Sequence, residues 1–140
     1  TTVVRQLLME KIIVQIGWCD NYCAASDEIL GCVACSDTIE GIKKEYRSAL
    51  DFHIKGLLED GDELLQKLKT EYELVFELDT SAMLHSLDGI VTRKAIAKVT
   101  GINEALLTHY ANGFRKPRPV QRQRIIDGIH QIGRELTLIG

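Results

Sequence analysis

Four cysteines stand at spacings that could support metal or redox chemistry in this 140-residue sequence. The pairs Cys19-x3-Cys23 and Cys32-x2-Cys35 are spaced much like zinc ligands. However, Cys32 and Cys35 lie an odd number of residues apart, so in a regular strand their side chains leave opposite faces. A zinc knuckle also needs a turn between its ligands, and Val33-Ala34 is not a turn dipeptide. We therefore expect small buried thiols in preference to a zinc site or a redox function, and disulfides are unexpected in a reducing compartment.

Three glutamates could suggest a nuclease metal site, because they alternate with the apolar residues of one predicted strand: Glu71, Glu73 and Glu77. A two-metal nuclease needs several carboxylates clustered in space, since two divalent cations have to be charge-compensated near the phosphate. The first predicted strand, residues 12–18, contains no Asp or Glu. We therefore expect a solvated strand face, no enzymatic activity and no cofactor, and we keep a metal-dependent nuclease as the third interpretation.

Charge is distributed unevenly along the chain. Residues 1–84 contain 8 Lys and Arg against 16 Asp and Glu, whereas residues 85–140 contain 9 against 4. The first part is thus net acidic and the second net basic. Because Lys and Arg neutralise phosphates and supply most non-specific affinity for nucleic acid, we expect the basic part alone to contact DNA.

The C-terminal third has the pattern of two short helices joined by a glycine turn. The buried side of the first helix is marked by apolar residues at Ile96, Ala97 and Val99. Gly101 supplies the turn, where a positive φ is least costly for glycine, and Asn103 can cap the next helix through its side-chain oxygen. The second helix repeats apolar residues at the spacing of a buried stripe, at Leu106, Leu107 and Tyr110.

This pattern, together with the segment Gly113-Phe114-Arg115-Lys116-Pro117, resembles the helix-turn-helix of the lambda-repressor-like family over about residues 84–136. In that family the second helix enters the DNA major groove. The resemblance implies DNA contacts from the outward positions of the second helix, from the start of the first helix, which lies near phosphates, and from a basic loop that follows the backbone. These residues are Arg93, Lys94, Asn103, Glu104, Ala105, Thr108, His109, Asn112, Arg115, Lys116 and Arg118.

The chemistry of the second helix leaves two alternatives open. Asn suits adenine, Thr can contact bases or phosphates, and Glu can accept a hydrogen bond from cytosine. The helix carries no Arg or Lys, so either specific binding has been lost or modest affinity is compensated by dimerisation. We expect a homodimer or a higher homo-oligomer, since paired half-sites need a two-fold protein. The interface would come from apolar residues of the last helix, Ile125, Ile126, Ile129, Ile132 and Leu136; Arg122 and Arg124 either extend the basic patch or are solvated.

Residues 11–78 predict a small α+β unit with the order strand, strand, strand, helix, strand. The strands are expected at residues 11–18, 22–25, 31–35 and 72–78. The helix is indicated by apolar residues at steps of three and four from Ile39 to Leu57, with Asp37 or Thr38 as its cap, Glu40 completing a capping box, and Asp60-Gly61 as its end. We expect a small antiparallel sheet covered on one face by this helix.

Two segments of this unit carry a second resemblance, Gly31-Cys32-Val33-Ala34-Cys35-Ser36-Asp37-Thr38 and His53-Ile54-Lys55-Gly56-Leu57-Leu58-Glu59-Asp60-Gly61. They are similar to the HicB antitoxin family, whose members carry a partial RNase H-like domain that is often followed by a DNA-binding domain. The resemblance covers roughly residues 10–80. It implies that the N-terminal domain binds a small mRNA-cleaving toxin of HicA type and that the C-terminal domain represses the operon. The connection at residues 62–70 is more helical in pattern than the Pro-rich stretch of the family.

These observations together predict a two-domain protein, with a HicB-like α+β domain at residues 1–78 and an all-α helix-turn-helix domain at residues 79–140. The predicted function is that of a type II antitoxin and autorepressor that binds double-stranded DNA and a small basic toxin. The alternative is a stand-alone transcriptional regulator whose first domain dimerises or senses a ligand. No apolar run of about 18 residues occurs, so no membrane span is expected. The start also lacks the layout of a signal peptide, and we expect a cytoplasmic protein.

Overall fold

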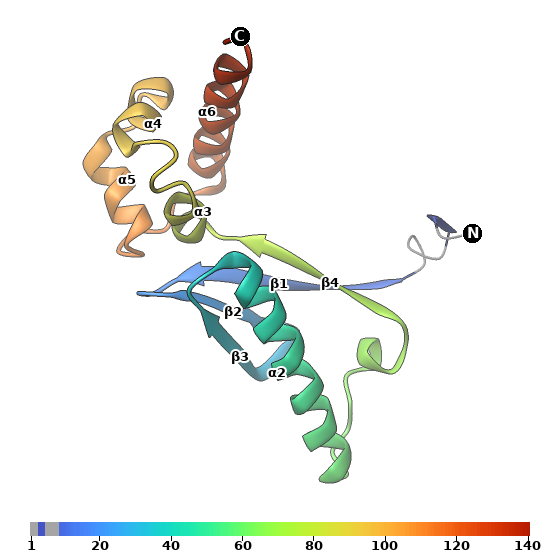
Figure 1. The fold of residues 1–140 in the computed structure, drawn as a ribbon. Coiled ribbons are helices and arrows are strands. Elements are labelled where there is room, and N and C mark those ends of the chain that lie inside the picture. The colour runs from blue at the N-terminus through green and yellow to red at the C-terminus, as the bar shows by residue number, and fades with distance from the viewer. Residues whose placement is uncertain (1–2, 5–8) are drawn as a thin grey trace. The chain divides into compact units, whose positions relative to one another are not determined.

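The described part of the protein combines a four-stranded sheet with five α-helices, and the strands precede most of the helices (Figure 1). The computed structural model describes residues 3–4 and 9–140. The chain divides between Leu78 and Asp79 into two compact units, here called the sheet unit and the helical unit. None of the helices in the described ranges is long and apolar enough to cross a membrane.

The sheet unit has the predicted order of elements. It consists of β1 (Glu10–Trp18), β2 (Tyr22–Ser26), β3 (Ile29–Ser36), α2 (Ile39–Glu59), the short 3-10 helix η1 (Gln66–Lys69) and β4 (Tyr72–Leu78). The expectation of a fully antiparallel sheet is wrong. The strand order is β3-β2-β1-β4, and β4 runs parallel to β1, whereas the other two pairs are antiparallel. The crossover through α2 returns the chain to the end of the sheet where β1 began, and this is the connection that a parallel pair requires.

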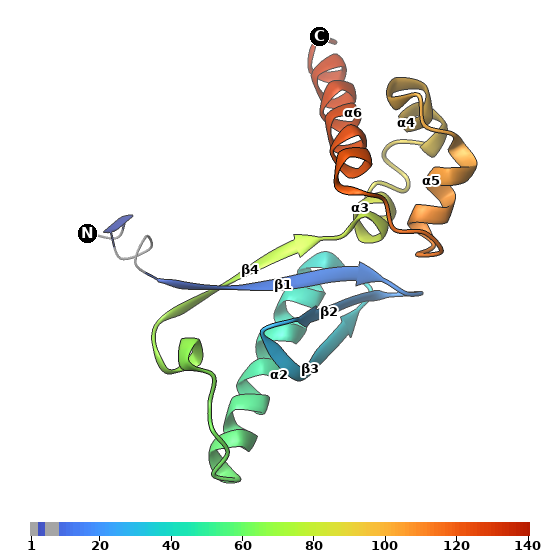
Figure 2. The ribbon, with the colours of Figure 1, turned by 180° about the vertical axis from the view of Figure 1, so that it is seen from behind.

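Helix α2 covers one face of the sheet, as the front and back views show (Figures 1 and 2). Its buried residues are Ile42, Tyr46 and Leu50, and alternate residues of β1 are buried with them at Ile12, Val14 and Ile16. The cap is Thr38, whose Oγ1 accepts a hydrogen bond from Gly41 N at 2.9 Å. The expected capping box from Asp37 and Glu40 is therefore wrong, because the helix starts one residue later and places Gly41 where the acidic partner would have to be.

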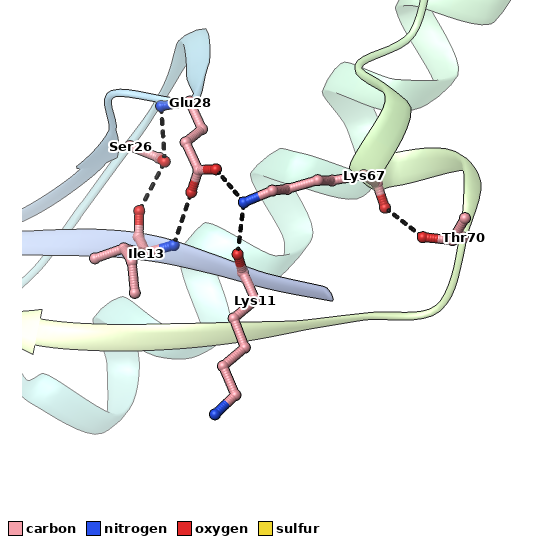
Figure 3. A network of polar contacts seen from close by, with 6 residues as sticks. All are labelled: Lys11, Ile13, Ser26, Glu28, Lys67 and Thr70. Carbon is pink, nitrogen blue, oxygen red and sulfur yellow. Dashed lines mark hydrogen bonds and ion pairs between the residues drawn. The ribbon is translucent and has the colours of Figure 1, made fainter. Parts of the chain in front are cut away.

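The connection after α2 is less helical than its sequence pattern indicated, because only one 3-10 turn forms at residues 66–69. That turn carries Lys67 to the edge of β1, where β2 no longer pairs with it beyond Gln15 (Figure 3). Lys67 Nζ donates to Lys11 O at 3.0 Å and to Glu28 Oε1 at 2.5 Å. Glu28 Oε2 in turn accepts from Ile13 N at 3.1 Å. Side chains thus satisfy the backbone of β1 where the neighbouring strand has ended.

The Glu28–Lys67 pair predicts an acid-dependent contribution to stability. The Lys67 side chain and the Ile13 N–H lower the pKa of the Glu28 carboxyl below its ordinary value. A lowered folded-state pKa stabilises the fold above the unfolded-state pKa, and the contribution is lost as the pH falls through the folded-state pKa. Because both side chains are about a third exposed, we expect Glu28→Gln to lower the free energy of unfolding at pH 7 by only about 0.5–1 kcal/mol.

Urea unfolding of Glu28→Gln and of the parent protein from pH 7 to pH 3 measures this contribution. The difference should shrink as the pH falls below about 4, the ordinary range for glutamate. Glu63→Gln is the matched control, since Glu63 is exposed and also lies near η1. A difference that stayed constant down to pH 3 would contradict the ionic origin of the effect.

The expectation that the cysteines are small buried thiols is wrong for three of the four. Cys32 is buried, Cys23 is half-buried, and Cys19 and Cys35 are exposed. The alternation of β3 places Cys32 on the face covered by α2 and Cys35 on the other face. A two-layer unit with one helix leaves one sheet face uncovered, so every second strand position is open to solvent.

The helical unit packs four helices around one core. They are α3 (Thr80–Ser86), α4 (Arg93–Thr100), α5 (Glu104–Ala111) and α6 (Pro119–Thr137). The core is formed by Leu84, Ile96, Ile102, Leu107, Tyr110, Ala111 and Ile125. Ile125, expected at a dimer interface, lies in this core, and Ile129 and Ile132 pack partly against it. The unit needs these isoleucines to enclose its own small core, so the predicted dimer interface is corrected at these positions. Leu136, in contrast, is 55% exposed.

Candidate nucleic-acid interface

The turn between α4 and α5 has the predicted glycine geometry. Helix α4 begins after Thr92, whose Oγ1 accepts from Ala95 N at 3.0 Å. It ends at Gly101, which has φ 74° and donates its N–H to Ala97 O at 2.8 Å. This left-handed conformation is strained for residues with a Cβ, so the sequence fixes the turn at this position.

Thr100 ties the turn to both helices, a role that the sequence pattern did not indicate. Its Oγ1 donates to Ile96 O at 2.7 Å and accepts from Ile102 N at 3.2 Å. The Thr100 side chain is buried. Its hydroxyl takes the place of water as the acceptor for the Ile102 N–H, which has no partner within a helix. The start of α5 is therefore held in a fixed direction relative to α4.

Asn103 caps α5 as predicted, since its Oδ1 accepts from Ala105 N at 2.8 Å. This contact bears on the predicted base contact. A bidentate contact with adenine uses the amide oxygen as acceptor and the NH2 group as donor. The oxygen already accepts from the helix start, so a base contact has to share it or use the NH2 group alone.

Most of the eleven predicted DNA-contacting residues are exposed. The exposed residues are Lys94, Asn103, Glu104, Ala105, His109, Asn112, Arg115, Lys116 and Arg118, and the half-buried ones are Arg93 and Thr108. On α5 the buried residues are Leu107, Tyr110 and Ala111, so the polar residues occupy the outward side of the helix. A helix with this division can lie against a groove without disturbing its own core.

Arg93 is less available for phosphate than its position in the sequence suggested. Its Nη2 lies 3.4 Å from Asp88 Oδ2, which is also 3.4 Å from His85 Nδ1. The Arg93 Nε is buried and has no hydrogen-bond partner among the described residues. Part of its charge is thus neutralised within the α3–α4 connection. Lys94, the next residue, is exposed.

The basic loop at residues 113–118 folds back on the end of α5. Gly113 has φ 77°, and the N–H groups of Phe114 and Arg115 both donate to His109 O, at 3.0 and 3.4 Å. Pro119 is the first residue of α6, as predicted from the tolerance of Pro in a first turn. The loop is thus held between two helices, and its cationic side chains, Arg115, Lys116 and Arg118, are exposed.

Phe114 belongs to this surface and was not identified as a site residue from the sequence. Its side chain is 77% exposed, and its ring lies edge-on to His109 with centroids 6.1 Å apart. An apolar residue that follows a C-terminal glycine commonly folds back onto its helix. Here Phe114 does so on the outward side, where an exposed aromatic ring next to cations can pack on a sugar or a base.

The two arginines near the start of α6 have different surroundings. Arg122 Nη1 donates to Thr80 Oγ1 at 2.9 Å, and the residue is half-buried. Arg122 thus joins α6 to α3, a structural role that neither sequence alternative described. Arg124 is exposed, and its Nη2 lies beside the Gly101 turn, 3.2 Å from where a Cβ on that glycine would stand. Of the two, Arg124 fits the basic surface.

The carboxylates considered for a metal site are dispersed. Glu73 and Glu77 are exposed on β4, and Glu71 precedes the strand. Glu77 Oε2 accepts from Gln15 Nε2 at 3.2 Å. Within the described part of the chain, no group of three or more His, Cys, Asp or Glu side chains is arranged to hold a metal ion.

An apolar surface on the sheet unit runs along β3 and α2, and we call it the β3–α2 groove. Two hollows of about 530 and 390 Å3 share His53 and Leu57 among their lining residues. Large apolar side chains along it are strongly exposed at Leu30 (82%) and Phe52 (80%). Large exposed apolar patches on a protein surface often mark an interaction site.

No known protein-family profile matches the sequence. A search of curated proteins finds an uncharacterized 14.9 kDa protein from the rep-hol intergenic region of Haemophilus phage HP1 (strain HP1c1). It is 25% identical over 108 residues, which cover 75% of this chain and 80% of the phage protein. A likeness at this level transfers neither a family nor an activity, so the function has to be argued from the surfaces described above.

Proposed function

We propose that this protein is a type II antitoxin and autorepressor. The helical unit binds operator DNA, and the sheet unit binds a small basic, mRNA-cleaving toxin of HicA type. The observation that carries the proposal is the arrangement of α4 and α5 around the Gly101 turn, with polar residues on the outward side of α5 and a basic loop after it. This is the arrangement in which a second helix enters a major groove.

In this mode α5 supplies base contacts and the loop supplies phosphate contacts. Thr108, His109 and Asn112 lie along the outward side of α5, and Glu104 at its start can accept from a cytosine amino group. Arg115, Lys116 and Arg118 neutralise backbone phosphates and set the orientation on the duplex. Because α5 carries no cation, the loop dominates the salt-dependent part of the affinity.

A protein partner suits the sheet unit for two reasons. The first 84 residues contain twice as many acidic as basic residues, which favours encounter with a basic toxin. The β3–α2 groove exposes large apolar side chains at Leu30 and Phe52, and exposed apolar patches often mark sites of protein–protein interaction. We place the toxin on this groove.

A homodimer would present two α5 helices to two half-sites. The end of α6 and the residues after it expose apolar side chains at Leu136, Leu138 and Ile139, which are 55%, 83% and 78% exposed. Self-association through this segment would bury them. A larger homo-oligomer could form through the same contact if the sheet unit supplied a second self-association contact.

The repressor part of the proposal is tested by titrating a fluorescent duplex from the region upstream of the gene at several salt concentrations. Binding should be tighter than to an unrelated duplex, and log K should fall linearly with log salt concentration, with a slope near −0.9 for each neutralised phosphate. Equal affinity for both duplexes would show that the protein does not recognise a specific operator sequence. Absence of binding to either would leave the helical unit as an oligomerisation module.

The antitoxin part predicts that Phe52→Asp weakens capture of the small basic protein encoded beside the gene. A buried interface aromatic contributes about 2 kcal/mol or more, which corresponds to a loss of at least about 30-fold in affinity. Val120→Asp is the matched control, since Val120 is 83% exposed, as Phe52 nearly is, but lies in the helical unit. Equal effects of the two substitutions in a calorimetric titration would place the toxin elsewhere.

A stand-alone transcriptional regulator is the second candidate, and the hollow of about 530 Å3 in the β3–α2 groove favours it as a site for a small ligand. The two functions differ in one simple observation. An antitoxin co-purifies with the product of a neighbouring gene and suppresses its toxicity. A stand-alone regulator purifies alone, and Leu30→Asp, a change in the lining of that hollow, then alters the ligand response without affecting cell survival.

A further inference from the structure

Three thiols gather near the open face of the sheet, the face opposite α2. Cys23 of β2 and Cys35 of β3 are direct partners in the antiparallel register of the two strands. The neighbours of Cys23 in β2, Tyr22 and Ala24, are buried on the covered face. Cys19 lies in the turn between β1 and β2 and is exposed. No function considered above uses these side chains.

The register brings Cys23 and Cys35 to a separation that a disulfide can span. Directly opposed residues of an antiparallel pair have Cα atoms about 4.5–5.5 Å apart, and disulfides join Cα atoms about 4.4–6.8 Å apart. Both side chains leave the sheet on the same face, because opposed residues share a face. The two side chains lie close enough to interact, since hydrogen bonding with Cys35 is the largest cause that raises the pKa of Cys23.

The two thiols differ in exposure. Cys35 is exposed, whereas Cys23 is half-buried. The hydrogen bond to Cys35, partial burial and the proximity of the other thiols together raise the pKa of Cys23 to about 11. Cys23 thus stays a neutral thiol at pH 7. An oxidant from solvent reaches the sulfur of Cys35 first, and Cys23 is held next to it as the resolving thiol.

We propose that Cys23 and Cys35 form a reversible cross-strand disulfide, which makes the open sheet face an oxidation site for a peroxide. In the first step a hydroperoxide transfers one oxygen to the Cys35 sulfur, so Cys35 becomes a sulfenic acid and the peroxide leaves as an alcohol or as water. In the second step Cys23 gives up its proton, its thiolate sulfur attacks the sulfenic sulfur, the S–S bond forms as the S–O bond breaks, and the hydroxide leaves with that proton as one water molecule. A dithiol reductant reverses the modification by thiol–disulfide exchange.

The other two cysteines serve as internal comparisons. Cys32 is buried on the face covered by α2, so it reaches neither partner nor solvent. Cys19 is exposed and close enough for its charge to raise the pKa of Cys23. It stands beyond the last paired residues of β1 and β2, Trp18 and Tyr22, and has no opposed cysteine in the register. Cys19 is thus the competing partner that the experiment has to separate.

The test is oxidation of the reduced full-length protein with one equivalent of hydrogen peroxide, followed by alkylation and mass spectrometry. All four cysteines lie between Lys11 and Lys43, so trypsin leaves them in one peptide. Cleavage before Asp20 and Asp27 separates Cys19 from Cys23, and Cys23 from Cys35. We expect a mass loss of two hydrogens, two alkylated thiols in place of four, and a peptide 20–26 linked to peptide 27–36.

Cys23→Ser and Cys35→Ser should each abolish the link, whereas Cys32→Ala and Cys19→Ser should retain it. Oxidation should also raise the thermal midpoint of the parent protein by about 5 °C or more, because the bond constrains the unfolded hairpin. The thermal midpoints of the reduced variants show whether each one folds. Sulfinic acid at Cys35 without a link, a link from Cys19, or a disulfide between two chains would overturn the proposal. DNA and toxin binding play no part in these readouts.

Discussion

Replacing both Arg115 and Lys116 by alanine is expected to weaken binding of the upstream duplex by about 10- to 100-fold near 0.1 M salt. Both side chains are exposed in the loop between α5 and α6, and the loop backbone is held by hydrogen bonds to His109 O. The loss therefore reports on phosphate contacts and not on a disordered loop. Because two neutralised phosphates disappear, the slope of log K against log salt concentration should become shallower by about 1.8.

The change should affect all duplexes alike, since phosphate contacts carry no sequence information. The ratio of affinities for the upstream and unrelated duplexes should thus stay within about two-fold, whereas Asn112→Ala should lower that ratio. Lys44→Ala with Lys55→Ala is the matched control, because it removes two exposed cations from α2 in the sheet unit. If the control lost as much DNA affinity, the effect would reflect the net charge of the protein and not phosphate contacts made by this loop.

Local features of the structure could be predicted because they depend on neighbouring residues. The Gly101 turn, the Asn103 cap and the start of α6 at Pro119 each follow from one residue's backbone preference or side-chain reach. The strand–helix order of the sheet unit follows from the change of hydrophobic period between β3 and α2. These signals extend over a few residues and hardly depend on the rest of the fold.

Features that depend on which elements become neighbours could not be predicted in the same way. The alternation in β4 indicates which residues face the core, but it does not indicate whether the strand pairs with β1 or in which direction. The meeting of Cys23 and Cys35 depends on the register of β2 and β3, which shifts between Ala25 and Ser26. A shift of one residue would have moved the two thiols apart, and only the structure fixes it.

The candidate DNA interface shows the same division. The exposed residues of α5 followed from the stripe of buried ones, because a helix has only one inward side. The surroundings of Arg93 and Arg122 did not follow, since their partners Asp88 and Thr80 lie outside their own helices. Cations near a predicted interface are therefore the residues for which the sequence is least informative, because an internal partner and a phosphate compete for the same charge.

The second large effect is expected at the crossing of α4 and α6, where Gly128 is buried against Thr100. A Cβ on Gly128 would stand 2.4 Å from Thr100 Cγ2, closer than two carbon atoms can approach. Overpacking of this kind costs about 1–3 kcal/mol, and the better helix propensity of alanine returns up to about 1 kcal/mol. We expect Gly128→Ala to lower the free energy of unfolding of the helical unit by about 1–2 kcal/mol.

The matched control lies in the same helix, because a Cβ on Gly133 would meet nothing within 4 Å. Gly133→Ala should therefore stabilise the unit by about 0.5–1 kcal/mol, so the two substitutions differ in sign. Thr100→Ser removes the obstructing methyl group but keeps the hydroxyl that ties Ile96 to Ile102. In a double-mutant cycle followed by thermal unfolding, it should recover most of the loss in Gly128→Ala. If both alanine variants were stabilised equally, Thr100 would not be the barrier, and the close crossing of α4 and α6 would not depend on glycine.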